Sequence, residues 1–329
     1  MKKILALILP VIILCGCGKI SKQQKDISTY FPFYANKIYV YTYNNSNYKD
    51  EKIYTMYETD NKMQSKIDMG SVSMIKIFQN VNGELKSKNV TVDNCHLENM
   101  LDTNFDDAYT EIKEPLEVGT SWNLPEVSGA KKQITNMNAK IETEYANFDN
   151  AMEITTTWDN ENMTTKDYYV PGIGLVKSIS QTSADPIILQ LSKIIDNTAY
   201  ESHQKIYLVD ENNEKLVTKT FDLKLFTNDD VNEKILSAMK ENNLVTSAAK
   251  INKFEVDRSN QDSIINIDFN SNFIDLTKLG ASSETLTLQA IVNTFGHIYG
   301  VDKIKLTVDG KNYESGHILM EDGDLFDVK

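Results

Sequence analysis

The sequence contains little of what most catalytic and nucleic-acid-binding proteins use. Its 34 basic residues include a single arginine, Arg258, and it has only four histidines. A site that holds phosphate through several bidentate guanidinium contacts is therefore excluded. His-Glu-x-x-His, Gly-x-Ser-x-Gly and P-loop motifs are absent. The net charge of −13 opposes binding to nucleic acid. We therefore expect no enzyme, no cofactor, no metal site and no nucleic-acid partner.

Cysteine is also scarce, and two of the three cysteines lie near the amino terminus. Residues 1–16 combine Lys2 and Lys3 with an apolar run to Leu14, which is typical of an export signal and too short to span a membrane. The segment Leu14-Cys15-Gly16-Cys17 resembles a lipobox, in which Cys17 becomes the acylated first residue. An ordinary signal peptide that happens to contain cysteines is the alternative. We predict that Cys17 is a lipid anchor on the extracytoplasmic face of the cell membrane.

Removal of the signal changes the chemistry of the remaining chain. It leaves 32 basic against 47 acidic residues, a net charge of −15, so acyl chains rather than surface charge must hold the protein at the membrane. Cys95 is then the single free cysteine, which excludes an intramolecular disulfide. Residues 17–27 are polar and predict a tether that keeps the folded body close to the bilayer.

Residues 28–197 predict a mainly antiparallel β domain, either a curved sheet or an open barrel. Short segments such as Ile38–Tyr43 are rich in β-branched and aromatic residues, and helical periodicity is weak. Asn82-Gly83 favours a tight type I′ hairpin. The other expected strands are 52–59, 62–69, 74–79, 86–92, 108–112, 133–144, 152–158, 164–169, 175–181 and 186–195.

Three features of this domain have both a functional and a structural interpretation. Cys95-His96 could be half of a metal site or a thiol with its base, but adjacent strand residues point to opposite faces, so we favour a buried thiol beside an exposed imidazole. Asp106-Asp107 could be paired catalytic carboxylates, but we favour a solvated loop. An aromatic run could stack on glycans, but we favour core packing. It comprises Tyr30, Phe31, Phe33, Tyr34, Tyr39, Tyr41 and Tyr43.

Residues 198–329 predict a smaller α+β domain with two helices on one face of an antiparallel or mixed sheet. One helix should follow the capping segment 227–230, and a second should be capped by Ser282 or Ser283 and end at Gly300. Gly296, inside the second helix, indicates close approach of a neighbouring element. The expected strands are 204–208, 216–225, 251–256, 264–269 and 304–308, with 317–320 as a last element; Asp309-Gly310 predicts a turn after 304–308.

Candidate binding residues in this domain are weak. Asp257, Asn260 and Asp262 could form a calcium loop, and so could Glu321, Asp322 and Asp324, but neither set fits the twelve-residue ligand pattern. His297 lies near the carboxyl end of the second helix, where the helix dipole favours a cation. We expect Asn293 to cap or bond a nearby loop and Thr294 to bond the backbone one turn back.

The same region resembles a known family. The strand "INIDFNSNF" (265–273) is followed by "LTLQAIVNTFGHIYGVDKIKLTVDGK" (286–311) and by "GHI" (316–318). With Asp268, Asn293-Thr294 and Val301, this order is similar to the GerMN domain of sporulation and germination lipoproteins and of some other envelope lipoproteins. The resemblance implies a ring-building type of α+β fold used for assembly rather than for a reaction, and it leaves open whether sporulation is involved.

Two classes of function remain. In the first, the protein is a non-enzymatic assembly or scaffold lipoprotein of the cell envelope, which contacts a protein partner or itself through the second domain. In the second, it binds or senses a lipid or glycan through the β domain. A deep apolar cavity in the β domain would favour the second class. A strictly monomeric protein that recovers no envelope partner would exclude the first.

Overall fold

The computed structural model describes residues 26–329 except 71, 91–96, 126, 128, 160, 182–184, 211, 213, 259–262 and 276–278. The predicted signal peptide and the predicted anchor Cys17 lie outside the described residues. So do Cys95, His96, Asn260 and Asp262, so the metal or thiol site and the first calcium loop are not tested by the structure.

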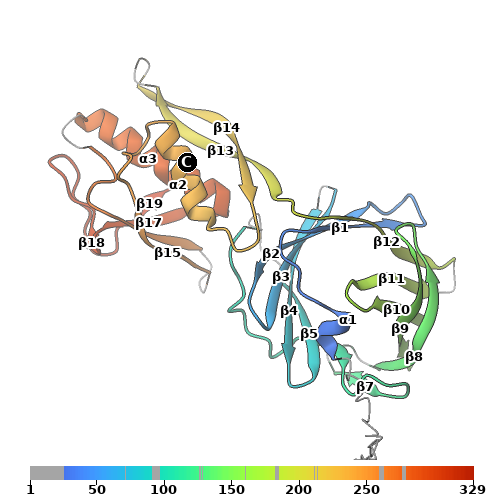
Figure 1. Ribbon diagram of the computed structural model, residues 1–329. Coiled ribbons are helices and arrows are strands. Elements are labelled where there is room, and N and C mark those ends of the chain that lie inside the picture. Colours follow the sequence, from blue (N-terminus) through green and yellow to red (C-terminus); the bar gives the residue numbers. More distant parts are fainter. Residues whose placement is uncertain are drawn as a thin grey trace, which may run out of the picture.

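Twelve antiparallel strands form one sheet that curls into a nearly closed barrel, as Figure 1 shows. Its strand order is β6-β5-β4-β3-β2-β1-β12-β11-β10-β9-β8-β7, so neighbours in sequence pair almost throughout. The strands are β1 (Ile38–Tyr43), β2 (Glu51–Glu58), β3 (Lys62–Met69), β4 (Val72–Val81), β5 (Glu84–Val90), β6 (Tyr109–Lys113), β7 (Ser121–Leu124), β8 (Ala130–Glu142), β9 (Asn147–Trp158), β10 (Glu161–Val170), β11 (Gly174–Gln181) and β12 (Ile187–Ile195).

Local sequence signals produced this meander. Asn82 and Gly83 both have positive φ, 53° and 73°, as the predicted type I′ turn between β4 and β5 requires. The short helix α1 (Ile27–Tyr30) precedes β1, and the Asp26 carboxylate accepts a hydrogen bond from the Thr29 backbone N–H at its start. Ile27 and Tyr30 are buried in the barrel's apolar cluster. Ile27, the last residue of the predicted tether, is therefore part of the folded barrel.

The sheet does not close by strand pairing, because β6 and β7 are the two ends of the strand order. Side chains join these ends instead. The Trp122 indole N–H on β7 donates to the Thr110 carbonyl on β6 at 2.9 Å. The Glu111 carboxylate on β6 pairs with the Lys132 ammonium on β8 at 2.6 Å. A bond between indole and carbonyl and a buried ion pair therefore bridge the seam.

The second domain is a mixed α+β unit, so the predicted fold class is confirmed for both parts. Its hairpin is β13 (Tyr200–Asp210) and β14 (Lys215–Leu225), which pair over eleven residues. Strand β16 (Ile264–Phe269) runs antiparallel to β15 (Ile251–Asp257) and parallel to β17 (Lys303–Val308), with short β18 (Lys311–Asn312) and β19 (Phe326–Asp327) beside β17. The segment 317–320, expected as an element, forms an isolated bridge between Glu314 and Leu319.

Two helices cover this sheet, α2 (Val231–Glu241) and α3 (Ala281–Tyr299). Asp230 caps α2 by accepting from the backbone N–H groups of Asn232 and Glu233. The predicted cap of α3 was wrong: Gly280 occupies the N-cap, so Ser282 and Ser283 lie in the first turn. Gly280 has the extended backbone that is usual for an N-cap residue, and no side chain caps the helix. Gly300 ends the helix at φ 62°, as predicted.

Gly296 is a point of close approach on α3, as the sequence indicated. A Cβ atom placed there would lie 2.2 Å from Val328 Cγ2 and 2.7 Å from Val328 Cγ1. The residues after β19 pack against α3 at Gly296, which has no side chain. The Val328 backbone N–H donates to the Asp302 carbonyl at 2.9 Å. The glycine is therefore needed for packing.

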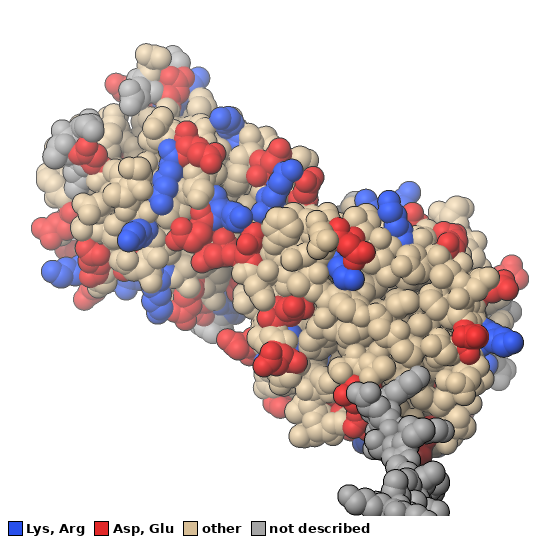
Figure 2. Space-filling view, viewed as in Figure 1, with Lys and Arg blue, Asp and Glu red and all other residues tan. Residues whose placement is uncertain are grey.

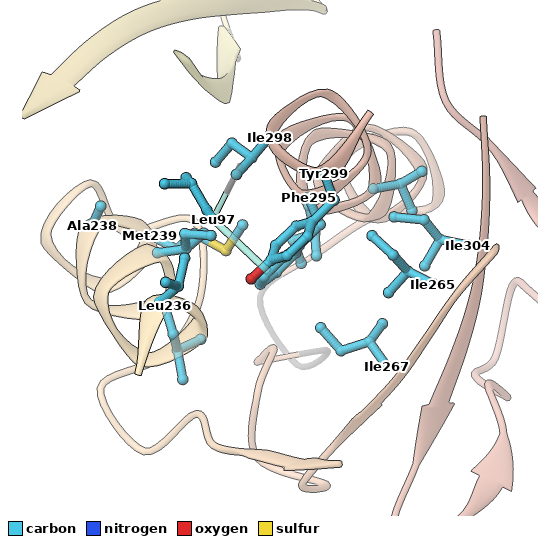
Figure 3. Close-up of a cluster of buried hydrophobic side chains, with 14 of the residues drawn as sticks. Leu97, Leu236, Ala238, Met239, Ile265, Ile267, Phe295, Ile298, Tyr299 and Ile304 are labelled. Atoms are coloured by element: carbon cyan, nitrogen blue, oxygen red, sulfur yellow. The ribbon is translucent and has the colours of Figure 1, made fainter. Parts of the chain in front are cut away.

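The two domains share one apolar core. Outward-facing residues of the barrel, such as Tyr54 and Ile77, belong to the same buried cluster as α2 and α3. Figure 3 shows Leu97, from the segment after β5, beside α2 and α3. Arg258 fixes this contact: its Nε donates to the Glu98 carboxylate at 3.0 Å and its Nη2 donates to the Tyr299 carbonyl at 2.9 Å. The lone arginine of the chain is thus an interdomain link.

Arg258→Lys should weaken this link, because an ammonium cannot donate to both acceptors with the same fork geometry. We expect a loss of about 1 kcal/mol in the free energy of unfolding, measured by urea titration. Lys253→Met is the control, because the Lys253 side chain is 70% exposed. A loss no larger than that of the control would show that Arg258 does not hold the domains together.

Candidate binding cavity in the barrel

A cavity of about 240 Å³ lies inside the barrel, between β1–β4 and the turn that joins β10 to β11. Its walls come from alternate residues of each strand, whereas the intervening residues, such as Tyr54 and Ile75, face the second domain. The lining is mainly apolar. It consists of Phe31, Pro32, Tyr34, Tyr39, Tyr41, Glu51, Ile53, Thr55, Met63, Ser65, Ile67, Lys76, Phe78, Ile173, Gly174, Leu175 and Leu189.

The strand register sorts the lining into layers, because paired residues lie side by side on one face. Tyr39 pairs with Ile53 and Ile53 with Ile67, which makes an apolar layer. Met63 pairs with Phe78 and makes a second apolar layer. Between them, Thr55 pairs with Ser65 and Ser65 with Lys76. We call Thr55, Ser65 and Lys76 the polar layer.

The polar layer has incomplete hydrogen bonding. Ser65 is 1% exposed, and its hydroxyl has no hydrogen-bond partner. The Thr55 hydroxyl donates only to the Met63 sulfur, at 3.5 Å, and thioether sulfur is a weak acceptor. Lys76 Nζ contacts Glu111 at 2.9 Å. Buried hydroxyl groups normally have oxygen or nitrogen partners. The hydroxyls of Ser65 and Thr55 are therefore available to hydrogen-bond a molecule inside the cavity.

Tyrosines contribute their ring faces to the cavity while their hydroxyls bond elsewhere. The Tyr41 hydroxyl donates to the Leu175 carbonyl at 2.7 Å, and that of Tyr34 donates to the Gly172 carbonyl. Burial raises the pKa of Tyr41 and of Tyr39 above the ordinary tyrosine value. Four members of the aromatic run thus line the cavity: Phe31, Tyr34, Tyr39 and Tyr41.

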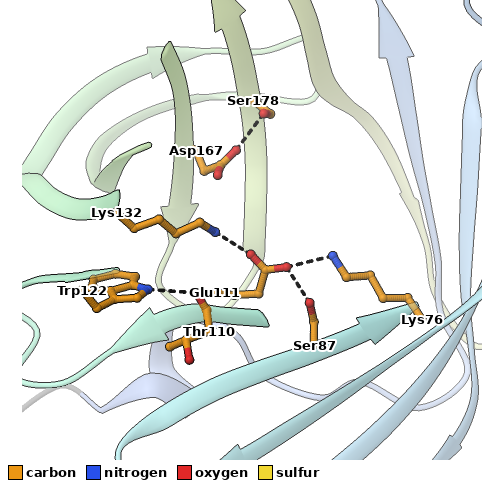
Figure 4. Close-up of polar contacts among 8 residues, drawn as sticks. All are labelled: Lys76, Ser87, Thr110, Glu111, Trp122, Lys132, Asp167 and Ser178. Carbon is orange, nitrogen blue, oxygen red and sulfur yellow. Dashed lines mark hydrogen bonds and ion pairs between the residues drawn. The ribbon is translucent and has the colours of Figure 1, made fainter. Parts of the chain in front are cut away.

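Lys76 of the polar layer also belongs to a largely buried charge cluster, which Figure 4 shows. The Glu111 carboxylate contacts the ammonium groups of Lys76 and Lys132 at 2.9 and 2.6 Å and accepts from the Ser87 hydroxyl at 2.6 Å. Burial by itself would raise the pKa of Glu111, but Lys132 and Lys76 lower it well below its usual value. Asp167 accepts from the Ser178 hydroxyl at 2.7 Å, and burial raises its pKa.

This cluster draws on strands that are distant in sequence. Glu111 lies on β6, Lys132 on β8 and Asp167 on β10, so no local motif could identify it. Three donors occupy the Glu111 carboxylate, which ties β4, β5 and β8 to β6. The cluster therefore closes the barrel and fixes one cation, that of Lys76, at the cavity wall.

The other acidic candidates make local contacts. Asp107 pairs with Lys88, and Asp106 accepts from the Asn104 amide at 2.7 Å. Asp324 accepts from the Glu321 backbone N–H at 2.7 Å, and Asp322 accepts from the Asn312 amide. Within the described residues, no group of three or more His, Cys, Asp or Glu side chains is arranged to hold a metal ion.

The polar residues of α3 serve packing. His297 Nδ1 lies 2.9 Å from the Asn293 carbonyl, and its Nε2 lies 3.2 Å from the Tyr207 hydroxyl. The Asn293 side chain accepts from the Lys329 backbone N–H, and the Thr294 hydroxyl donates to the Ala290 carbonyl one turn back, so both expectations are confirmed. Across residues 26–329 as described, none of the helices has the length and apolarity to cross a membrane.

Part of the second domain matches a known protein family. Residues 205–314 match the model of the Germane family, described as "Sporulation and spore germination", which confirms the GerMN-like resemblance. No curated protein has a sequence significantly similar to the chain.

Two solved structures are similar at low identity. One is a protein described as exported, with a YmcC-like fold, from Bacteroides fragilis NCTC 9343: 10% identity, TM-score 0.31, covering 51% of this chain and 99% of that one. The other is described as a lipoprotein, from Clostridium perfringens: 16% identity, TM-score 0.25, covering 40% of this chain and 88% of that one.

Proposed function

Because residues 205–314 form a Germane domain, we propose that the protein is a sporulation- or germination-related envelope lipoprotein that acts by contact rather than catalysis. Acylated Cys17 would hold it on the extracytoplasmic face of the cell membrane. Its Germane domain would bind an envelope protein. The lipobox-like segment before Cys17 and the self-paired buried charges of the barrel support this function.

The observation that carries the proposal is the free edge of β14. On the other side of the hairpin, α3 covers the edge of β13, since the Tyr207 backbone N–H donates to the Thr294 hydroxyl at 3.0 Å. Among the described strands, β14 pairs only with β13. The strand is eleven residues long, and at its end the Leu225 carbonyl accepts a hydrogen bond from the Tyr54 hydroxyl. Unpaired backbone groups along the rest of such an edge are a template for an added strand. Val217 and Phe226 add apolar contacts, at 37% and 45% exposure.

The position of the β14 edge and its rigid attachment to the barrel also suit a contact function. Figure 1 shows the hairpin β13–β14 running along one side of the second domain, and the shared core fixes that domain to the barrel. Figure 2 shows charged side chains of both signs interspersed over the second domain, with few on the end of the barrel that faces the viewer. An edge held rigidly on a tethered body loses little entropy when it binds.

The test is a crosslinking pull-down of the acylated protein from intact envelopes. The variant Val217→Lys with Thr220→Lys adds charges that disfavour strand addition along the edge. We expect the wild type to recover a protein partner and the double variant to lose most of it. Thr157→Lys, at an exposed position of β9, is the matched control. Equal recovery by all three proteins, or none by the wild type, would contradict the proposal.

The cavity supports a second function, binding of a small ligand by the β domain. Apolar lining with a few polar groups is the usual composition of ligand sites, and the barrel cavity has both. Removing Ser65, Thr55 or Lys76 side-chain polarity should not affect the pull-down, so the two functions are separable.

A further inference from the structure

We propose that the barrel cavity binds a single-chain anionic amphiphile, with its acidic head on Thr55, Ser65 and Lys76 and its hydrocarbon chain against the apolar layers. The proposal rests on the second candidate function, ligand binding by the β domain, and is independent of the β14 edge. It assigns both the class of ligand and the orientation of the ligand in the site.

The unsatisfied hydroxyls identify where the head lies. The Ser65 hydroxyl is buried with no partner, and the Thr55 hydroxyl beside it has only a sulfur acceptor. Leaving such a group unpaired costs free energy that a ligand oxygen would recover. Both hydroxyls can donate, and the Lys76 ammonium has three donors. A carboxylate or phosphate oxygen fits this set because it accepts several hydrogen bonds and carries the opposite charge to Lys76.

The remaining charges of the cavity orient the ligand. Glu51 lines the cavity four residues before Thr55 on β2, which is about 13 Å along the strand. Its carboxylate repels an acidic head from that end. Near Lys76, one carboxylate, that of Glu111, is shared by two ammonium groups. The polar layer therefore favours the anion.

The volume restricts the ligand to one chain. A cavity of about 150 Å³ lined by apolar side chains binds benzene, and sites for drug-sized molecules are about 300–1,000 Å³. At about 240 Å³ the barrel cavity has room for part of one hydrocarbon chain. Tyr39, Ile53 and Ile67 form the wall against which the chain would pack. A glycan would need a polar partner for each hydroxyl, and the polar layer offers only three side chains.

Two classes of molecule combine an acidic head with a single hydrocarbon chain: a free fatty acid and a lysophospholipid of the membrane. The following experiment distinguishes them. The full chain, reconstituted in phosphatidylcholine nanodiscs, is exposed to dodecanoate that carries a photoactivatable diazirine in its chain. Adducts are mapped by mass spectrometry. Unlabelled dodecanoate, dodecanol and lysophosphatidylglycerol are the competitors. Displacement by dodecanoate alone identifies a fatty-acid site, and displacement by lysophosphatidylglycerol as well identifies a site for both heads.

We expect adducts on the cavity wall, at Ile53, Ile67 or Leu175. Dodecanol should compete about tenfold less well than dodecanoate, since a hydrogen bond to a charged group is worth about a tenfold change or more in affinity. Lys76→Met should remove most of this preference. Ser65→Phe and the smaller Ser65→Leu should fill the cavity and abolish labelling. Ser121→Phe, at an exposed position of β7, is the control and should label like the wild type. Circular dichroism establishes that each variant is folded.

Two results would overturn the assignment, and they differ in meaning. If no adduct forms in the barrel, or labelling survives both Ser65 substitutions in folded protein, the cavity is not a binding site and the second candidate function fails with it. If dodecanol competes as well as dodecanoate, the cavity binds hydrocarbon chains but does not recognise an acidic head. In that case ligand binding by the β domain stands, and the assignment of an anionic ligand is wrong.

Discussion

Replacing Glu111 by glutamine should reduce the free energy of unfolding by about 3–5 kcal/mol, because it removes the counter-charge of the buried Lys132 ammonium and of the partly exposed Lys76 ammonium. Lys132 and Lys76 both contact the Glu111 carboxylate, and the contact from β6 to Lys132 on β8 crosses the seam between β6 and β7. Urea unfolding of the full chain measures the loss. Glu117→Gln is the control, because Glu117 is exposed in the turn before β7.

The same pair predicts how stability depends on pH. The pKa of Glu111 is held well below its usual value of 4.5 by the two lysines, against the effect of burial. A carboxyl group with a lowered pKa in the folded state stabilises the fold at pH values above its unfolded pKa. That contribution is lost as the pH falls from about 4.5 toward the folded pKa. Glu111→Gln should therefore flatten the decline in stability below pH 4.5.

A result that contradicts this account is a loss for Glu111→Gln no greater than that for Glu117→Gln, with unchanged pH dependence. A further comparison separates charge from packing. Glu111→Leu combined with Lys132→Met replaces the pair that bridges the seam by apolar groups and should recover part of the stability, since a buried ion pair is often replaceable as a whole.

Gly296→Val should be the other severe substitution, with a loss of about 2–3 kcal/mol in the free energy of unfolding. The cause is overpacking: even a Cβ atom at this position would meet Val328 Cγ2 at 2.2 Å. The carboxyl-terminal residues must then leave α3. Calorimetric unfolding of the full chain measures the loss, and Gly280→Ala is the control because a Cβ there meets no atom within 4 Å.

The reciprocal change tests the cause. Gly296→Val with Val328→Gly moves the same atoms from one side of the contact to the other and should restore most of the stability, because the total volume is kept. A double variant as unstable as Gly296→Val alone would mean that backbone effects, rather than the contact with Val328, explain the glycine.

The sequence could predict the features that depend on neighbouring residues. Ile38–Tyr43 forms β1 with the expected ends, and Asn82-Gly83 forms the expected turn, because alternation and turn chemistry are local. The cap of α3 was placed too late because the prediction relied on a serine side chain, whereas the helix begins after Gly280 with no side-chain cap. The four-residue elements α1 and β7 were not predicted as such, since they are too short for a periodic pattern.

The candidate site could not be predicted in this way. Ser65, Lys76 and Glu111 meet only after β3, β4 and β6 curl into a barrel, and each residue alone is an ordinary strand residue. The aromatic run gave the one usable signal. Its period-two spacing at Tyr39 and Tyr41 placed both side chains on one face, and the closure of the sheet made that face the inner one.

The most direct test of the contact function is site-specific photocrosslinking in intact envelopes, with a photoreactive amino acid at Thr220 in the middle of β14 or, as the reference, at Thr157 on β9. The account predicts a discrete crosslinked product from Thr220 that contains an envelope protein, and none from Thr157. Crosslinking to lipid alone from Thr220, or the same products from both positions, would contradict it.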